Sequence, residues 1–189
     1  MNYYIADLHI SHAHVIEYDN RPFSCIEEMN ETLIANWNSV VSKNDTVYVI
    51  GDFIWKKEQE WSPILEELKG NIVLIKGNHD PKQFSSKTRR YFADVKDYKE
   101  IEDNGTTVIM CHYPIPFFKH DFNVNAVMLY GHVHTSEEYQ YLYKLRKEII
   151  NNKSEKGPTG NFVNVGCMMP YMAYTPRTIN EIMGSINNE

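Results

Sequence analysis

The chain has 189 residues, a length that suits one domain of ordinary size. Apolar residues make up 42% of it and charged residues 23%, which is the usual balance of a soluble globular protein. The formal net charge is −6 and the chain has no block of lysine or arginine, so we expect no broad binding to nucleic-acid backbones. Small phosphorylated substrates stay open, because bound cations can reverse the sign of a local site.

The longest apolar runs have the length of a strand, which excludes a transmembrane helix. Residues 1–7 lack the basic segment and the long apolar stretch of a signal peptide. We therefore expect a cytoplasmic protein without a membrane partner, present as a monomer or a small homo-oligomer. The three cysteines have no paired spacing, so neither a disulfide framework nor a thiolate zinc site is predicted.

The first half of the chain alternates predicted strands with predicted helices. Short aromatic or β-branched apolar runs at residues 2–6, 46–50 and 71–76 indicate strands. Between them, apolar side chains recur at helical spacing over residues 25–40 and 57–69. A start of the second helix near Ser62, with Pro63 at its first position, is the alternative. The resulting order β-α-β-α-β predicts parallel strands that are joined by helices.

The second half follows a different pattern. Residues 95–102 and 106–111 are predicted to form a hairpin, with Asn104-Gly105 at its tip. The remaining predictions are a loop over residues 10–22, strands at 126–130 and 161–165, a helix over 136–152 and a short helix at 179–183. Since no internal repeat or linker interrupts these elements, residues 1–189 are predicted to form a single domain.

Short polar motifs stand at the ends of five predicted strands. They are Asp7-x-His9, Gly51-Asp52, Gly77-Asn78-His79-Asp80, His112 and Gly131-His132-x-His134. Each motif alone has an ordinary explanation, as a tight turn or a core histidine. Because the carboxyl ends of strands line one edge of a sheet, we expect the motifs to converge on one crevice. Carboxylate, imidazole and amide ligands without thiolate suit Mn²⁺, Fe²⁺ or Zn²⁺, and the set is large enough for two ions with one shared carboxylate.

The order of these motifs resembles the calcineurin-like metallophosphoesterase superfamily over about residues 7–134. The segment Asp19-Asn20-Arg21-Pro22-Phe23 is similar to one in its small single-domain bacterial and phage members. The resemblance implies an α/β fold, with a β-sandwich of mixed sheets flanked by α-helices and an active site at the C-terminal ends of the strands. It further implies one metal held by Asp7, His9 and His134, a second held by Asn78, His112 and His132, a bridge at Asp52, a catalytic His79, and Asp80 as the partner that orients His79.

The resemblance implies hydrolysis of phosphoester bonds by in-line attack of a metal-bridging hydroxide, with His79 assisting the leaving group. The expected cofactors are two divalent ions, with Mn²⁺ first and Fe, Zn or Ni as alternatives. We expect a phosphodiesterase of small nucleotide-type substrates, and a cyclic nucleotide is compatible. A phosphomonoesterase or a diphosphate hydrolase is the alternative within the enzyme class, and a non-catalytic metal-binding scaffold is the alternative outside it.

Substrate contacts are predicted more broadly. A guanidinium binds oxyanions through paired hydrogen bonds, so Arg21 is the expected phosphate contact, with a solvated or ion-paired loop arginine as the alternative. His12 and Tyr113 are candidates for the cleft lining, and a plain loop histidine and a packed tyrosine are the alternatives. Because Arg21 and a more remote Lys119 are the cations on offer, a diester is favoured over a dianionic monoester.

Overall fold

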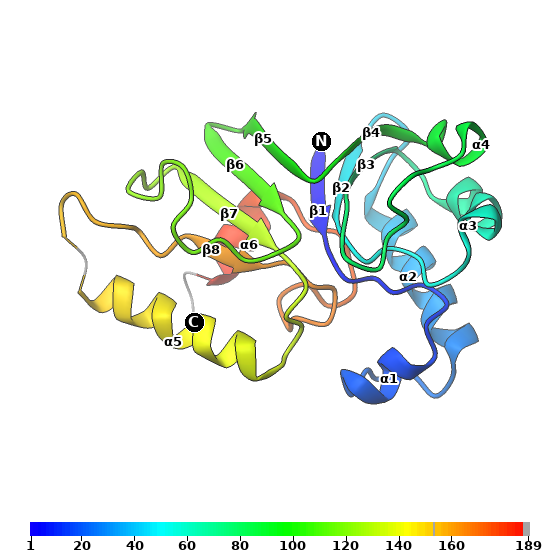
Figure 1. Cartoon of the computed structure of the whole chain (residues 1–189), viewed down its shortest axis with the longest axis horizontal. Coiled ribbons are helices and arrows are strands. Elements are labelled where there is room, and N and C mark those ends of the chain that lie inside the picture. The colour runs from blue at the N-terminus through cyan, green and yellow to red at the C-terminus, as the bar shows by residue number, and fades with distance from the viewer. Residues whose placement is uncertain (153, 187–189) are drawn as a thin grey trace.

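The computed structural model describes residues 1–152 and 154–186, and it contains two four-stranded sheets packed face to face (Figure 1). The first sheet is parallel throughout and has the order β1 (Asn2–Ile5), β2 (Thr46–Ile50), β3 (Asn71–Ile75), β4 (Phe92–Lys96). The second sheet is mixed and has the order β5 (Tyr98–Asp103), β6 (Thr106–Cys111), β7 (Ala126–Tyr130), β8 (Phe162–Asn164). Its first two strands are antiparallel and the others are parallel.

Helices cover the outer faces of both sheets. α2 (Ile26–Val40) and α3 (Trp61–Glu67) flank the first sheet, and α5 (Glu137–Asn151) flanks the second (Figure 1). The shorter elements are α1 (His14–Tyr18), the 3₁₀ helix η1 (Glu58–Glu60), α4 (Ser86–Arg89) and α6 (Ile179–Ile186). These layers of helix, sheet, sheet and helix confirm the predicted sandwich.

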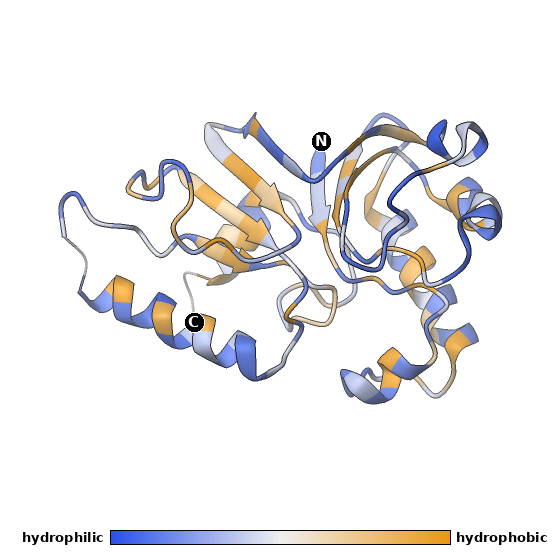
Figure 2. Cartoon of the chain, in the orientation of Figure 1, coloured by the Kyte–Doolittle hydropathy of each residue, from blue (hydrophilic) through white to orange (hydrophobic). Residues whose placement is uncertain are grey.

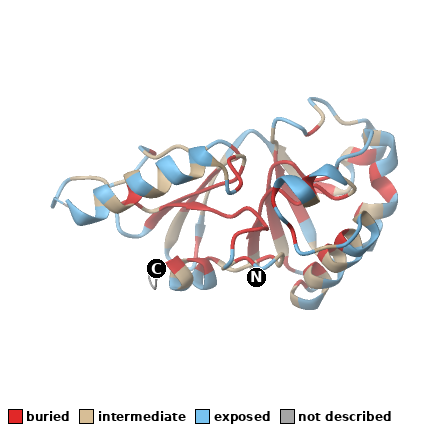
Figure 3. Cartoon of the chain, turned by 90° about the horizontal axis from the view of Figure 1, so that it is seen from below, coloured by how far each residue is buried: buried red, intermediate tan, exposed pale blue. Residues whose placement is uncertain are grey.

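One hydrophobic core fills the space between the sheets and continues under α2 and α3. Met29, Leu33 and Trp37 recur every fourth residue of α2, so they share one face of the helix and are buried in that core. Along β6, Val108 faces the central core while Ile109 faces a second cluster under α5, as strand alternation requires. Figure 3 shows the buried residues concentrated in the strands, and Figure 2 shows β6 and β7 as mainly apolar and the edge strand β5 as more hydrophilic.

The chain after β8 joins the two sheets at the C-terminal end of β1. The Ala6 N–H donates to the Val165 carbonyl at 2.8 Å, and the Cys167 N–H donates to the Ala6 carbonyl at 2.9 Å. The Val165 N–H in turn donates to the Tyr130 carbonyl, at the end of β7. The polar motif that follows β1 in the first sheet is thereby brought beside the motifs that follow β6 and β7 in the second.

The structure corrects the predicted hairpin. Val95 and Lys96 belong to β4 in the first sheet, and the chain enters the second sheet only at Tyr98. Between them stands Asp97, whose side chain is 83% exposed. The strand-like sequence pattern continues without a break from β4 to β5, so periodicity does not show where the chain passes from one sheet to the other.

Smaller corrections concern the helices. The helix expected from residue 57 begins at Trp61, after η1, because Pro63 fits the first turn of a helix and not its interior. The loop expected over residues 10–22 contains α1, and α4 was not predicted. Within residues 1–152 and 154–186, no helix is both long and apolar enough to cross a membrane.

Candidate active site

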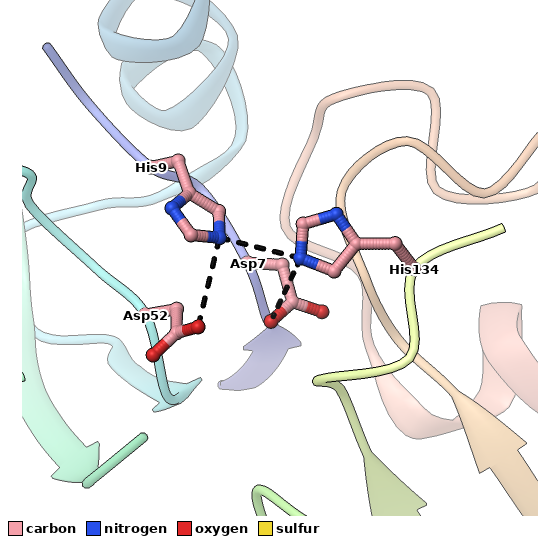
Figure 4. A group of neighbouring side chains, drawn as sticks. All are labelled: Asp7, His9, Asp52 and His134. Carbon is pink, nitrogen blue, oxygen red and sulfur yellow. Dashed lines mark hydrogen bonds and ion pairs between the residues drawn. The ribbon is translucent and has the colours of Figure 1, made fainter. Parts of the chain in front are cut away.

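The polar motifs predicted at the strand ends converge where β1, β2, β3, β6 and β7 finish. Asp7, His9, Asp52 and His134 are all buried, and each offers one ligand atom within 4.8 Å of the others (Figure 4). They come from the ends of three strands, two in the first sheet and one in the second. The sandwich thus builds a cluster of acids and imidazoles that could hold a metal ion.

A second group lies beside the first. The Asn78 Oδ1 atom is 2.9 Å from His112 Nε2 and 2.9 Å from His132 Nδ1. The Asp52 Oδ2 atom is 3.6 Å from His112 Nε2 and 3.6 Å from His9 Nε2. One carboxylate oxygen therefore stands between the two groups, in the position that a ligand shared by two ions would take.

The hydrogen-bond partners of the two ring nitrogens of His112 indicate what the second group can bind. His112 Nδ1 lies 3.0 Å from the Ile50 carbonyl oxygen, which can only accept. With that carbonyl as its partner, Nδ1 carries the N–H of a ligating imidazole, so Nε2 offers its lone pair beside the amide oxygen of Asn78. Two such electron-pair donors side by side fit a metal ion, which would accept both.

The first group also brings two imidazole nitrogens together. His134 Nδ1 donates to the Asp19 carboxylate at 2.7 Å, and His134 Nε2 faces His9 Nε2 at 3.3 Å. Although burial disfavours its charge, the hydrogen bond with Asp19 and the charge of Asp7 raise the pKa of His134. Burial, together with the charge of His134, lowers the pKa of His9 to about 2, so its imidazole is neutral and able to ligate. Burial also raises the pKa of Asp7, although the charges of His134 and His112 and the hydrogen bond from the His132 N–H oppose the shift. Carboxylates, imidazoles and an amide oxygen in two such groups fit two divalent transition-metal ions.

The backbone is strained at these residues. Five of them have φ angles between 47° and 70°, in the left-handed region: Asp7, His9, Asp52, His132 and His134. That conformation is uncommon for residues other than glycine, costs about 1–3 kcal/mol at each position, and clusters at functional sites. This backbone conformation directs the side chains toward the site. No sequence pattern predicts it.

Glycines leave room for the polar side chains of the site. A Cβ atom on Gly51 would lie 2.1 Å from His112 Nδ1, and one on Gly77 would lie 2.2 Å from Asp52 Oδ1. A Cβ atom on Gly131 would lie 2.6 Å from Asp7 Oδ2. The glycines that sequence reading assigned to turns therefore serve a second purpose, which is to leave room for the polar side chains opposite.

We expect the substitution Gly51→Ala to lower the free energy of unfolding by at least about 2 kcal/mol and to displace His112. Gly105→Ala is the matched control, because Gly105 has a similar φ of 79° but nothing within 4 Å of its added Cβ. The control should lose only about 1–2 kcal/mol, the cost of the left-handed backbone. Urea denaturation measures both variants, and equal losses would show that the approach of His112 is irrelevant.

A buried ion pair supports His134 from behind. Asp19 accepts from His134 Nδ1 through Oδ1 and pairs with Arg21 through Oδ2, and the side chains of both Asp19 and Arg21 are 0% exposed. Although burial disfavours its charge, these partners lower the pKa of Asp19, so it is ionised. Arg21 also donates to the carbonyls of Asp7 and Leu8, at 2.9 Å each. The network fixes both the ring of His134 and the backbone that carries Asp7.

This geometry corrects the prediction for Arg21. Its Nε, Nη1 and Nη2 atoms all donate to acceptors inside the protein, and the side chain has no exposed surface with which to bind phosphate. The ion-pair alternative is the one that the structure supports. Asp19 was missed as a site residue, because nothing in the sequence indicates that it reaches a histidine 115 positions away.

Replacing Asp19 with asparagine should weaken Mn²⁺ binding about 10–100-fold, because a carboxylate behind a ligating histidine orients it and raises its basicity. Titration calorimetry of the metal-free protein measures this directly, without an activity assay. Asp103→Asn is the control, since Asp103 is equally buried but accepts from Tyr4 at the other end of the fold. If both variants bound Mn²⁺ like the unmodified protein, Asp19 would have no part in the site.

The predicted pair of His79 and Asp80 is placed differently from expectation. Asp80 is buried and accepts from the backbone N–H groups of Asp52, Phe53 and Gly77, at 2.8–3.0 Å. It therefore ties the loops after β2 and β3 together and does not hold the His79 ring. The His79 side chain is exposed, and its backbone N–H donates to Asp52 Oδ1 at 3.0 Å. The site position of His79 thus comes from its main chain.

The rim of the site carries the other residues named from the sequence. Tyr113 is 48% exposed and lies edge-on to His132, with 4.5 Å between ring centroids. His12 stacks on Trp55 at 3.8 Å, and Trp55 lies 4.5 Å from His79. An open cleft of about 500 Å³ follows this side of the site, lined by Ile54, Trp55, Lys56, Lys57 and His79. Trp55 and the two lysines were missed, because they follow Gly51-Asp52 without forming a motif.

Comparison with known proteins agrees with this geometry. The family model described as calcineurin-like phosphoesterase matches residues 3–159. An uncharacterized protein of Methanocaldococcus jannaschii is 40% identical over 161 residues, which cover 80% of this chain and 84% of that protein. The Gene 66 protein of Mycobacterium phage L5 is 36% identical over 81 residues, which cover 41% of this chain and 39% of that protein.

Among solved structures, a protein of unknown function from Aquifex aeolicus has the same fold. Its TM-score is 0.67 with 24% sequence identity, over 98% of both chains. The family match spans all five strand-end motifs, from Asp7 to His134. With a buried acid and histidine cluster where those motifs converge, the chain belongs to the calcineurin-like phosphoesterase family and is a metal-dependent phosphohydrolase.

Proposed function

We propose that this phosphohydrolase is a phosphodiesterase of small nucleotide-type substrates, that it uses two Mn²⁺ ions, and that Asp52 is their common ligand. The observation that supports two ions is the position of Asp52 Oδ2, 3.6 Å from the Nε2 atoms of both His9 and His112. In this proposal Asp7, His9 and His134 complete one site, and Asn78, His112 and His132 complete the other. Two bound ions would supply Lewis acidity and an acidified water next to the substrate phosphorus.

The residues of the chain then have separate tasks. Asp19 and the Ile50 carbonyl hold His134 and His112 so that their Nε2 atoms point inward. Asp80 keeps the loops after β2 and β3 at a fixed separation. His79 lines the cleft and is free to give a proton to the oxygen of the leaving group, a role that an imidazole performs well near neutral pH.

Room for two substituents supports a diester. Trp55 lies 5.7 Å from His9, next to the first group of ligands. Tyr113 lies 4.5 Å from His132, in the second group. An aromatic side chain therefore stands at each end of the row of ligands. A phosphodiester has a substituent to place at each end, whereas a monoester leaves one end unused.

A phosphomonoesterase or a diphosphate hydrolase remains the second candidate, and one observation favours it. Lys56 and Lys57 line the cleft beside His79, so more positive charge is present than Arg21 and Lys119 alone suggested. Lys119 itself pairs with Glu100 at 2.8 Å. Additional cations are what a dianionic phosphate or a diphosphate requires.

A substrate panel on the Mn²⁺-loaded protein tests the proposal. We expect turnover of nucleotide diesters, loss of that turnover when the metal is removed with a chelator, and recovery when Mn²⁺ is returned. A higher kcat/KM for nucleoside monophosphates or diphosphates than for diesters would favour the second candidate. Metal binding without turnover of any phosphoester would leave the protein as a metal-binding scaffold.

A further inference from the structure

The cleft beside His79 contains an aromatic surface that is held rigidly in place. The Ile10 N–H donates to the Phe53 carbonyl at 3.0 Å, and the Trp55 N–H donates to the Ile10 carbonyl at 2.8 Å. This pairing sets Trp55 against His12, with the two rings 7° from parallel and 3.8 Å apart. Trp55 remains 39% exposed, whereas Trp37 and Trp61 are buried. An indole kept at the surface of a cleft by its backbone and a stacked ring is preorganised for another flat group.

Positive charge lies in the same cleft. Lys56 and Lys57 both line it and are exposed. Within the part of the chain that the structure describes, neither ammonium group has a carboxylate within 4.0 Å, unlike Lys76, Lys96, Lys99 and Lys119. Lys56 also lines a neighbouring cavity that contains Glu27, Glu31 and Glu67. Because those carboxylates offset the charge of Lys56, Lys57 is better placed to bind an anion.

The position of His79 decides which part of the substrate enters. His79 and Trp55 line the cleft together, with 4.5 Å between their ring centroids. The group that takes a proton from His79 is the one that leaves, so the cleft accommodates the leaving side of the substrate. Flat aromatic character and negative charge together describe a nucleotide.

We propose that the cleft formed by Ile54, Trp55, Lys56, Lys57 and His79 binds the leaving nucleoside of a phosphodiester, with the base on Trp55 and a further phosphate near Lys57. This inference rests on the proposed phosphodiesterase function and narrows it to nucleotide diesters with an anionic leaving side, such as short oligonucleotides. In the reaction, a water oxygen bonds to phosphorus and the bond from phosphorus to the nucleoside oxygen breaks. His79 delivers the proton that this oxygen acquires.

Matched substrates test the inference with the Mn²⁺-loaded full chain. The reference is the methyl ester of thymidine phosphate, followed by its release of methanol, so that no nucleoside leaves. The second substrate is the dinucleotide of two thymidines, and the third is that dinucleotide with an added terminal phosphate at either end. We expect kcat/KM for the dinucleotide to exceed that for the methyl ester by about tenfold or more, the range of one base stacked on an aromatic ring. The added phosphate should raise kcat/KM by a further three- to fivefold, about the value of one exposed charge pair.

Variants separate the two contacts. In Trp55→Ala, the ratio of kcat/KM for the dinucleotide to kcat/KM for the methyl ester should fall to about the ratio of the uncatalysed hydrolysis rates of the two esters. Trp55→Phe should restore most of the ratio that the unmodified protein shows. Lys57→Ala should remove only the gain from the added phosphate. Lys43→Ala is the control, because Lys43 is exposed in the turn before β2, at the opposite end of that strand from Asp52.

Binding supplies a second readout. Thymidine 3′,5′-bisphosphate should quench the tryptophan fluorescence of the unmodified protein but not that of Trp55→Phe, because the other tryptophans are buried. Equal kcat/KM for the dinucleotide and the methyl ester, or an equal loss for both in Trp55→Ala, would overturn the inference. Failure of the unmodified protein to hydrolyse either ester would instead overturn the proposed function.

Discussion

Replacing Asp52 with asparagine is expected to lower kcat/KM about a thousandfold, which corresponds to about 4 kcal/mol of transition-state stabilisation. Asp52 Oδ2 faces the imidazoles of both ligand groups, so this change would remove a negative charge next to both of the proposed ions at once. The fold should survive, because the asparagine oxygen can still accept the His79 N–H that Asp52 Oδ1 accepts now.

Two measurements decide this prediction. Elemental analysis should find fewer than two Mn²⁺ ions per chain in Asp52→Asn, and kinetics on a nucleotide diester should show the loss of rate. Asp103→Asn serves as the control, since it removes a buried carboxylate that lies on β5, away from the ligands. A fully metal-loaded Asp52→Asn variant with normal turnover would show that Asp52 does not join the two groups.

The variant His79→Ala should show a loss that depends on the leaving group. An alkoxide needs a proton as it departs, so kcat/KM for a nucleotide diester should fall about 10²–10⁴-fold. A nitrophenolate leaves without one, so hydrolysis of bis(p-nitrophenyl) phosphate should fall less than about tenfold. His79 suits this role because its imidazole is exposed in the cleft while its main chain is fixed to Asp52.

The control for this experiment is His120→Ala, since His120 is exposed in the loop between β6 and β7. It should retain the kinetics of the unmodified protein on both substrates. If His79→Ala lost the same factor on the alkyl and the nitrophenyl ester, His79 would act by binding the phosphate or by supporting Asp52, and not by protonating the leaving group.

The sequence predicts well that the strand-end motifs lie close together, because the carboxyl ends of parallel strands lie along one edge of a sheet. Once β1, β2 and β3 are identified by their apolar runs, their carboxyl ends must lie along one edge. The motifs after β6 and β7 follow the same rule in the second sheet. The resemblance to a known family then supplied the grouping of the ligands, which spacing alone does not give.

What the sequence could not predict depends on contacts between distant segments. From its sequence position, Arg21 is expected to be an exposed loop arginine, whereas in the structure it is buried and donates to the carbonyls of Asp7 and Leu8. Asp19 acquires its role only from His134, and Trp55 only from His12, its stacking partner in another loop. None of these pairs has a fixed separation along the chain, so no local pattern announces them.

Asp80 shows a subtler limit. Its place next to His79 in the chain suggested that the two side chains interact, yet the Asp80 carboxylate accepts backbone N–H groups from two loops. Burial raises its pKa, and these N–H bonds oppose the shift by stabilising the charged form. The residue therefore fixes the loops that carry the site and affects His79 only indirectly.

We propose that two ions share Asp52 at the edge where the two sheets meet. Crystals of the Mn²⁺-loaded protein, measured for anomalous scattering of manganese, test it most directly. We predict two peaks, one among Asp7, His9, Asp52 and His134 and the other among Asp52, Asn78, His112 and His132. A single peak, or manganese bound away from Asp52, would show that Asp52 is not shared by two ions.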